Sequence, residues 1–177
     1  MDDDKPLTLL DLFEANYTSN KLSKDQLLLL GTIMAECGYL EAIIQMLIWE
    51  LSGLTSGAGA SITAHMSMND KLNALTSLSG HILEEHELNE TIQDLCKQTR
   101  RDILPKRNDL AHIPWSPTED GKGIEAQKIK ARGKLQVDFK TFSNEELDNF
   151  RRPVTLIGQG FSEVSSQLEK YFQQAAP

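Results

Sequence analysis

Three residue types that handle phosphates and protons stand close together at positions 107 to 112. Arg107 is followed directly by Asn108, and His112 comes four positions later. On a helix that turns about 100° per residue, Asn108 lies about 100° and His112 about 140° from Arg107, so all three project from one flank. Arginine offers a planar cationic fork to phosphate oxygens, histidine exchanges a proton near neutral pH, and asparagine can orient either. The three are a sufficient set for acid–base cleavage of a phosphodiester.

The apolar residues of this segment are expected to point elsewhere. Ile103, Leu110 and Ile113 recur at helical spacing, which predicts that they face a core and leave the polar trio together on the surface. A simpler interpretation stands beside the catalytic one. In it Arg107 is an ordinary surface arginine, and His112 is a histidine in the last helical turn, where the helix dipole favours positive charge. Spacing by itself leaves both interpretations open.

The charge of the chain is unevenly distributed. Its 177 residues include 18 Lys and Arg against 26 Asp and Glu, a net charge of −8. Residues 97–140 nevertheless hold eleven of the basic residues and six acidic ones, a net charge of +5, whereas the remainder carries −13. This local excess predicts a site for an anionic ligand; the alternative is that the lysines solubilise a hairpin and protect its edge. The candidate contacts, which would be RNA contacts if the ligand is RNA, are Arg100, Arg101, Lys106, Lys128, Lys130 and, by base stacking, Trp115.

The elements that must position these residues are mostly helical. Capping boxes predict helix starts at Ser23, Ser67 and Ser143, each with an acidic or amide residue three positions on. Apolar residues recur behind each start at steps of three and four. The expected helices span residues 23–54, 67–80, 89–113 and 143–172. Pro105 is expected to interrupt the third of these, bending or restarting it just before Arg107.

Two segments have a different pattern. Residues 52–61 are rich in Gly and Ser, which predicts a loop. In residues 121–142 an Arg-Gly pair precedes strictly alternating apolar residues, which predicts a β-hairpin. The expected fold class is therefore mainly α, a four- to five-helix up-and-down bundle with a small β-hairpin inserted before the last helix. One domain is expected over 23–177, after an acidic stretch, 1–22, that carries a short amphipathic helix.

The composition is typical of a cytoplasmic protein. The start, Met-Asp-Asp-Asp-Lys, is unlike a secretory signal. The sequence has no run of about 18 unbroken apolar residues, the length that a membrane span needs, so no membrane contact is expected. Cys37 and Cys96 form no Cys-x-x-Cys pair and are expected to be buried and reduced. His81 and His86 lack the i, i+4 spacing of a zinc helix. Neither a metal nor another cofactor is expected.

The run Arg107-Asn108-Asp109-Leu110-Ala111-His112 resembles the Arg-polar-x3-His motif of the HEPN superfamily, the higher eukaryote and prokaryote nucleotide-binding domain. The motif closes an expected helix and precedes Phe142-Ser143-Asn144-Glu145-Glu146-Leu147, which resembles the start of the family's final helix. Residues 38–47, with Glu41 expected among inward-facing apolar residues, resemble an earlier long helix of the family. The likeness covers roughly residues 27–172.

The resemblance implies a homodimer that brings two copies of the motif into one cleft, and in many such domains metal-independent cleavage of RNA by its own 2′-hydroxyl. Carried over, His112 acts as acid or base, Arg107 stabilises the charged phosphorane and Asn108 positions them. Glu41 and Asp109 would support them, although Glu41 can equally be a partly exposed bundle carboxylate. A toxin or phage-defence protein with a cognate antitoxin is the implied setting. The alternative is a non-catalytic module that binds RNA, a nucleotide or a protein.

Two departures from the family pattern bear on this interpretation. Some toxin members carry a tyrosine two residues beyond the histidine, where a partner nucleotidyltransferase modifies it, but this chain has Pro114 there. Pro105 stands two residues before Arg107 and either aims the arginine into the cleft or marks an inactive copy.

Overall fold

The computed structural model describes residues 22–132 and 134–175, with the side chains of 127–137 outside its description. The short helix predicted within residues 1–22 lies outside the described residues. The chain divides into two compact units. Unit 1 comprises residues 1–30 and 113–147, and unit 2 comprises residues 31–112 and 148–177.

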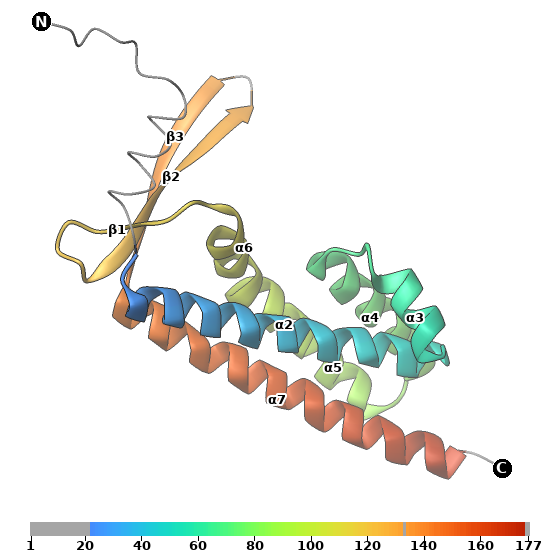
Figure 1. Ribbon diagram of the computed structural model, residues 1–177. Helices are drawn as coiled ribbons and strands as arrows, with labels where there is room; N and C mark the ends of the chain where they lie inside the picture. Colours follow the sequence, from blue (N-terminus) through green and yellow to red (C-terminus); the bar gives the residue numbers. More distant parts are fainter. Residues whose placement is uncertain (1–21, 133, 176–177) are drawn as a thin grey trace, which may run out of the picture. The chain divides into compact units, whose positions relative to one another are not determined.

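The chain is mainly helical, with a small antiparallel sheet before the last helix, as the sequence predicts (Figure 1). The helices are α2 (Lys24–Ser52), α3 (Ser56–Thr63), α4 (Met68–Ile82), α5 (Glu87–Gln98), the π-helical turn η1 (Thr99–Ile103), α6 (Leu104–His112) and α7 (Asn144–Ala175). The strands are β1 (Ser116–Pro117), β2 (Gly123–Arg132) and β3 (Lys134–Ser143), in the order β1-β2-β3.

Unit 1 is built around the predicted hairpin. Strands β2 and β3 pair antiparallel from Gly123 opposite Ser143 to Arg132 opposite Lys134. The side-chain amide of Gln26, in the first turn of α2, donates a hydrogen bond of 2.7 Å to the carbonyl of Gly123 and so ties the helix start to the sheet. The two-residue strand β1 was not predicted, because a Ser-Pro pair has no alternating apolar pattern.

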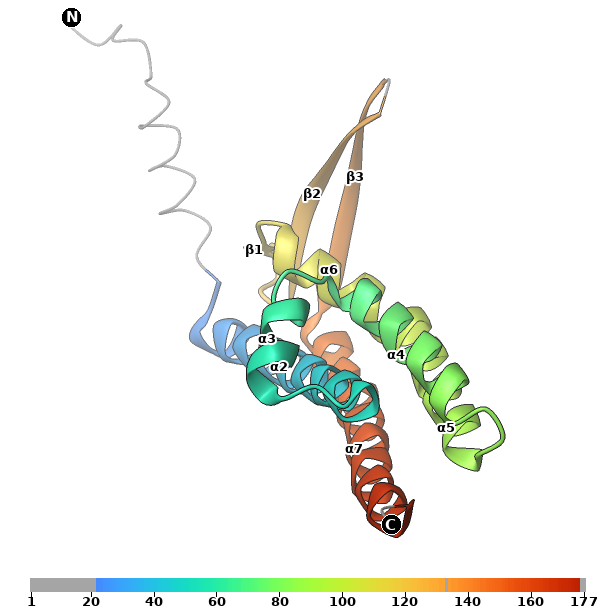
Figure 2. The same cartoon turned by 90° about the vertical axis from the view of Figure 1, so that its right-hand side faces the viewer.

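Unit 2 is a helical bundle. Within this unit α2 and α7 lie side by side in both views (Figures 1 and 2). The largest fully buried side chains of the unit are Ile33, Leu40, Ile44, Leu47, Leu72, Leu75, Leu83, Ile92, Ile103 and Phe161. They come from α2, α4, α5, η1 and α7 and the turn after α4, so the apolar spacing read from the sequence corresponds to one shared core.

The prediction of a loop over residues 52–61 was wrong, because most of the segment belongs to α3. Thr55 caps the helix by accepting a hydrogen bond from the backbone N–H of Ala58. A Cβ atom at Gly59 would lie 2.4 Å from the indole of Trp49, so only glycine lets α3 approach α2 this closely. The indole N–H of Trp49 donates to Thr63 at 3.2 Å. Small residues give α3 no apolar period, and packing against Trp49 stabilises the helix instead.

The predicted interruption near Pro105 takes the form of a π-helical turn, after which α6 starts at Leu104. The chain stays helical from Glu87 to His112, since α5, η1 and α6 follow one another without a gap. In the π-helical turn the N–H of Leu104 bonds to the carbonyl of Thr99, five residues back. Pro105 follows directly, at a position where the normal i to i−4 ladder has already been displaced, and this accommodates its missing N–H.

Candidate functional site

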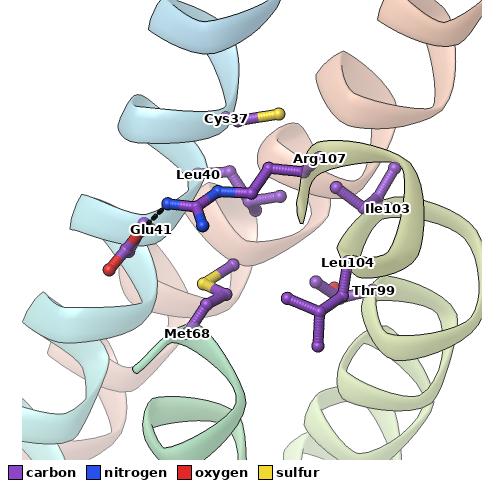
Figure 3. Close-up of a pocket in the computed structure, with 8 residues that line it drawn as sticks. All are labelled: Cys37, Leu40, Glu41, Met68, Thr99, Ile103, Leu104 and Arg107. Carbon is purple, nitrogen blue, oxygen red and sulfur yellow. Dashed lines mark hydrogen bonds and ion pairs between the residues drawn. The ribbon is translucent and has the colours of Figure 1, made fainter. Parts of the chain in front are cut away.

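Arg107 projects from α6 toward α2, where it meets Glu41 (Figure 3). Its Nη2 atom lies 3.4 Å from Oε2 of Glu41, and its Nη1 atom donates at 3.2 Å to Oδ1 of Asn108. Both contacts are long for hydrogen bonds from a guanidinium. The side chain of Arg107 is 26% exposed. It is therefore oriented by its neighbours while remaining within reach of a ligand.

Glu41 is held from its other side by Lys71 of α4. The Lys71 ammonium donates to Oε1 of Glu41 at 2.7 Å, and the lysine side chain is only 7% exposed. Glu41 thus bridges two cations, a buried lysine at short range and a partly exposed arginine at long range. Arg107 is thus the partner that the expected supporting role of Glu41 would need, and the carboxylate is also partly exposed, at 23%, as the alternative interpretation has it.

Sequence reasoning missed Lys71. A signal was present, because Lys71 occupies a place in the spacing of Met68, Leu72 and Leu75, all of which are buried. A lysine in an apolar helical stripe is almost never fully buried unless it is paired. That rule predicts a carboxylate partner without naming it, since the partner lies 30 residues away in the sequence.

A small cavity of about 10 Å3 lies beside Arg107, with room for roughly one water molecule. Its lining residues are Cys37, Leu40, Glu41, Met68, Thr99, Ile103, Leu104 and Arg107 (Figure 3). Burial raises the pKa of the Cys37 thiol to about 11; the positive charge of Arg107 acts against this, and the carboxylates of Glu36 and Glu41 add to it. At neutral pH Cys37 therefore lines the cavity as a protonated, uncharged thiol.

The remaining residues of the motif are placed differently from one another. Asn108 is exposed and contacts Arg107, whereas Asp109 is buried within α6. His112 is exposed in the last turn of α6, and among the described residues it makes no hydrogen bond to Arg107 or Glu41. The structure thus brings together Arg107, Asn108 and Glu41, and leaves the His112 imidazole free to meet a ligand from solvent.

The candidate RNA contacts of unit 2 are largely committed to protein partners. The ammonium of Lys106 lies 5.0 Å from the centre of the Phe150 ring. Arg100 donates to Oδ1 of Asn73 at 2.9 Å. Arg101 forms an ion pair of 2.7 Å with Asp102 but remains 74% exposed. Arg101 is consequently the most accessible of these three cations, and the basic excess read from the sequence overstates the charge that a ligand meets.

The other candidates belong to unit 1. The ring of Trp115 lies 5.4 Å from that of Phe142, in a tilted arrangement that covers part of the hairpin base. Its indole N–H is buried and has no acceptor among the described residues. Lys128 and Lys130 lie on β2, opposite Asp138 and Gln136 in the register. Packing explains the position of Trp115 without a nucleobase.

No family model, curated protein or solved structure matches the chain. Within residues 22–132 and 134–175, no three His, Cys, Asp or Glu side chains are grouped as metal ligands would be.

Proposed function

We propose that the protein is an HEPN-type endoribonuclease that cleaves RNA without a metal, using Arg107, Asn108 and His112. The observation that carries the proposal is that the Arg107 side chain is oriented by its neighbours but not fully occupied by them. Its guanidinium is held by two long contacts, to Glu41 at 3.4 Å and to Asn108 at 3.2 Å, so it retains donors for a phosphate. Lys71 neutralises Glu41 from the other side, which lets Arg107 turn to a ligand without stranding a carboxylate.

The chemistry that fits these groups is attack of a ribose 2′-hydroxyl on the adjacent phosphorus. A bond forms between O2′ and phosphorus while the bond from phosphorus to O5′ breaks, which yields a 2′,3′-cyclic phosphate and a 5′-hydroxyl. One imidazole accepts the O2′ proton and another donates a proton to O5′. Arg107 stabilises the extra negative charge of the phosphorane, and Asn108 holds the guanidinium in place.

A homodimer supplies the second imidazole in this proposal, because one His112 cannot act as base and acid in the same step. We place the protein in the cytoplasm as a toxin or phage-defence component with a cognate antitoxin. Helix α2 is, among the described helices, the one long and apolar enough to cross a membrane. Core helices of soluble proteins share that property, and α2 carries Glu36 and Glu41 in ion pairs within unit 2.

The test incubates labelled single-stranded RNA with purified protein in EDTA and identifies the new ends. Wild type is expected to leave cyclic phosphates and to spare DNA of the same sequence. His112→Ala and Arg107→Ala are expected to slow cleavage at least about a hundredfold, the usual contribution of a general acid or base. Lys97→Ala is the matched control, because Lys97 is an exposed cation that pairs with Asp94 and is not among the candidate RNA contacts. Unchanged cleavage by His112→Ala would overturn the assignment of the site.

A second candidate function is RNA binding without cleavage. It is favoured by the absence, among the described residues, of a hydrogen bond that would orient the His112 imidazole against Arg107 or Glu41. This module would bind RNA with an affinity that falls steeply with salt and would leave the strand intact. Binding measured in the same EDTA buffer, alongside the cleavage assay, separates the two functions.

A further inference from the structure

A second site candidate lies in unit 2, in the groove between α2 and α7. The groove has a volume of about 520 Å3, within the range of small-molecule sites. Its lining residues are Ala35, Glu36, Tyr39, Leu40, Val154, Thr155, Gly158, Gln159 and Ser162. It shares only Leu40 with the cavity beside Arg107, so it is distinct from the proposed catalytic site.

Glu36 lines this groove and has one carboxylate oxygen that receives no hydrogen bond. Arg151 of α7 directs both its Nε and its Nη2 at the same carboxylate oxygen, Oε1, at 3.0 and 2.7 Å. The other oxygen, Oε2, is buried and receives no hydrogen bond. Arg151 is also shared with Asp148 at 3.4 Å, so two carboxylates face one guanidinium. A buried carboxylate oxygen without a donor is costly, and a ligand that supplies the donor removes that cost.

The hydroxyl groups of the groove are acceptors as well. Thr155 donates its proton to the carbonyl of Arg151 at 3.1 Å, and Ser162 donates to the carbonyl of Gly158 at 3.0 Å. Each oxygen keeps lone pairs but has no proton left to give. The ring of Tyr39 is 65% exposed and offers a face that attracts cations. A carboxylate, two hydroxyl acceptors and an aromatic ring form a set that favours a cationic donor and disfavours an anion.

We propose that the groove between α2 and α7 binds an aliphatic amine, whose ammonium donates to Glu36 and whose methylene chain packs against Leu40 and Val154. An ammonium is all donors, which matches the Glu36 carboxylate and the hydroxyl oxygens of Thr155 and Ser162, while the amide oxygen of Gln159 offers a further acceptor. Both leucine and valine suit an alkyl chain. The net charge of −13 outside residues 97–140 attracts such a ligand from solution. The site does not depend on the proposed ribonuclease activity.

The experiment titrates the full chain with 1,4-diaminobutane at low salt by calorimetry, with 1,4-butanediol as the neutral analogue. Saturable one-to-one binding of the diamine is expected, with none of the diol. Glu36→Gln is expected to weaken binding at least tenfold, and Tyr39→Leu several-fold. Glu163→Gln, an exposed α7 carboxylate outside the groove lining, is the control and should leave the affinity unchanged.

Two features keep the proposal open to refutation. Glu36→Gln also weakens the contact with Arg151, whereas Tyr39→Leu leaves that ion pair intact, and thermal melts report whether each variant folds. Equal binding of the diol, equal affinity in Glu36→Gln, or no saturable binding by folded wild type would overturn the site. Tighter binding of Nα-acetyllysine amide than of the diamine would overturn the free amine as occupant and assign the groove to a lysine of a partner protein. Unchanged RNA cleavage in the Tyr39→Leu variant separates this site from the catalytic one.

Discussion

Two of the carboxylates of helix α2, Glu36 and Glu41, lie about 140° apart around its axis, and each meets an arginine from another helix. At Glu36 the arginine is fully engaged, since Arg151 directs two donors at one oxygen at 2.7 and 3.0 Å and the second oxygen receives none. At Glu41 the carboxylate is fully engaged, because Lys71 takes one oxygen at 2.7 Å and Arg107 the other at 3.4 Å. The Glu36–Arg151 pair therefore leaves one carboxylate oxygen without a donor, and the Glu41–Arg107 pair leaves guanidinium donors for another acceptor.

The difference shows that the ligand an ion pair can accept depends on whether its carboxylate or its arginine has a second ionic partner. Lys71 compensates Glu41, so Arg107 can move to an anion without leaving a buried charge unpaired. Glu36 has no second cation in unit 2 as described, so displacing Arg151 would strand the carboxylate. In the two proposals, one helix therefore supports an anion site and a cation site on different flanks.

The largest expected effect that separates the two pairs is on stability. Lys71→Met removes the buried cation and is expected to lower the free energy of unfolding by about 2–3 kcal/mol, less than a fully buried pair would lose, because Glu41 keeps Arg107. Arg151→Met leaves Glu36 without a cation in unit 2 as described, but the arginine side chain is 38% exposed and water replaces part of the lost interaction, so the cost should be smaller, about 1 kcal/mol. Urea denaturation of both variants measures the difference. Equal losses would contradict the asymmetry between the pairs.

An intermediate effect is expected on RNA affinity. Glu41→Gln releases Arg107 from its carboxylate and should tighten binding about fivefold, or roughly 1 kcal/mol, whereas Glu36→Gln should change the affinity less than about twofold. Fluorescence anisotropy with labelled RNA measures both in a His112→Ala background, in which the strand stays intact. The gain from Glu41→Gln should shrink as salt rises. A tighter complex from Glu36→Gln instead would reverse the assignment of the two flanks.

The smallest expected effect is on Cys37, whose thiol senses both pairs. Its folded-state pKa of about 11 exceeds the ordinary value of 9.0, so the free energy of unfolding is unaffected below pH 9 and falls as the pH rises from 9 to 11. In a Cys96→Ala background, Arg107→Met should raise this pKa, whereas Glu36→Gln and Glu41→Gln should lower it. The pH dependence of alkylation gives these values. If the pKa of Cys37 is the same in all three variants, the thiol does not lie close to either pair.

Much of the fold was predictable because its signals are local. The capping boxes are confirmed at Ser23 with Gln26, at Ser67 with Asp70 and at Ser143 with Glu146, each made by residues three positions apart. The hairpin also follows from alternation within one segment. Helix α3 was missed because its stability comes from Trp49 of another helix and the close approach at Gly59, which no local pattern encodes.

The site was predictable only along one helix. Spacing placed Arg107 and Asn108 together, and their side chains do contact each other. The commitments of Lys106 to Phe150 and of Arg100 to Asn73 depend on which helices pack together, so counting cations in the sequence could not show which of them a ligand would meet. The same holds for Lys71, which reaches Glu41 only after α4 has docked on α2.

The π-helical turn η1 gives the direction of Arg107 an unusual origin. A wider turn accommodates one residue more than an α-helical turn over the same rise, so α6 is rotated relative to α5 by about 100° from where an uninterrupted helix would put it. Deleting a single residue between Thr99 and Ile103 would restore the regular ladder and turn Arg107 off the flank that faces Glu41. The direction of the Arg107 side chain thus depends on the length of this segment and not on the identity of any one of its residues, so a change of length there would act like a substitution of Arg107 itself.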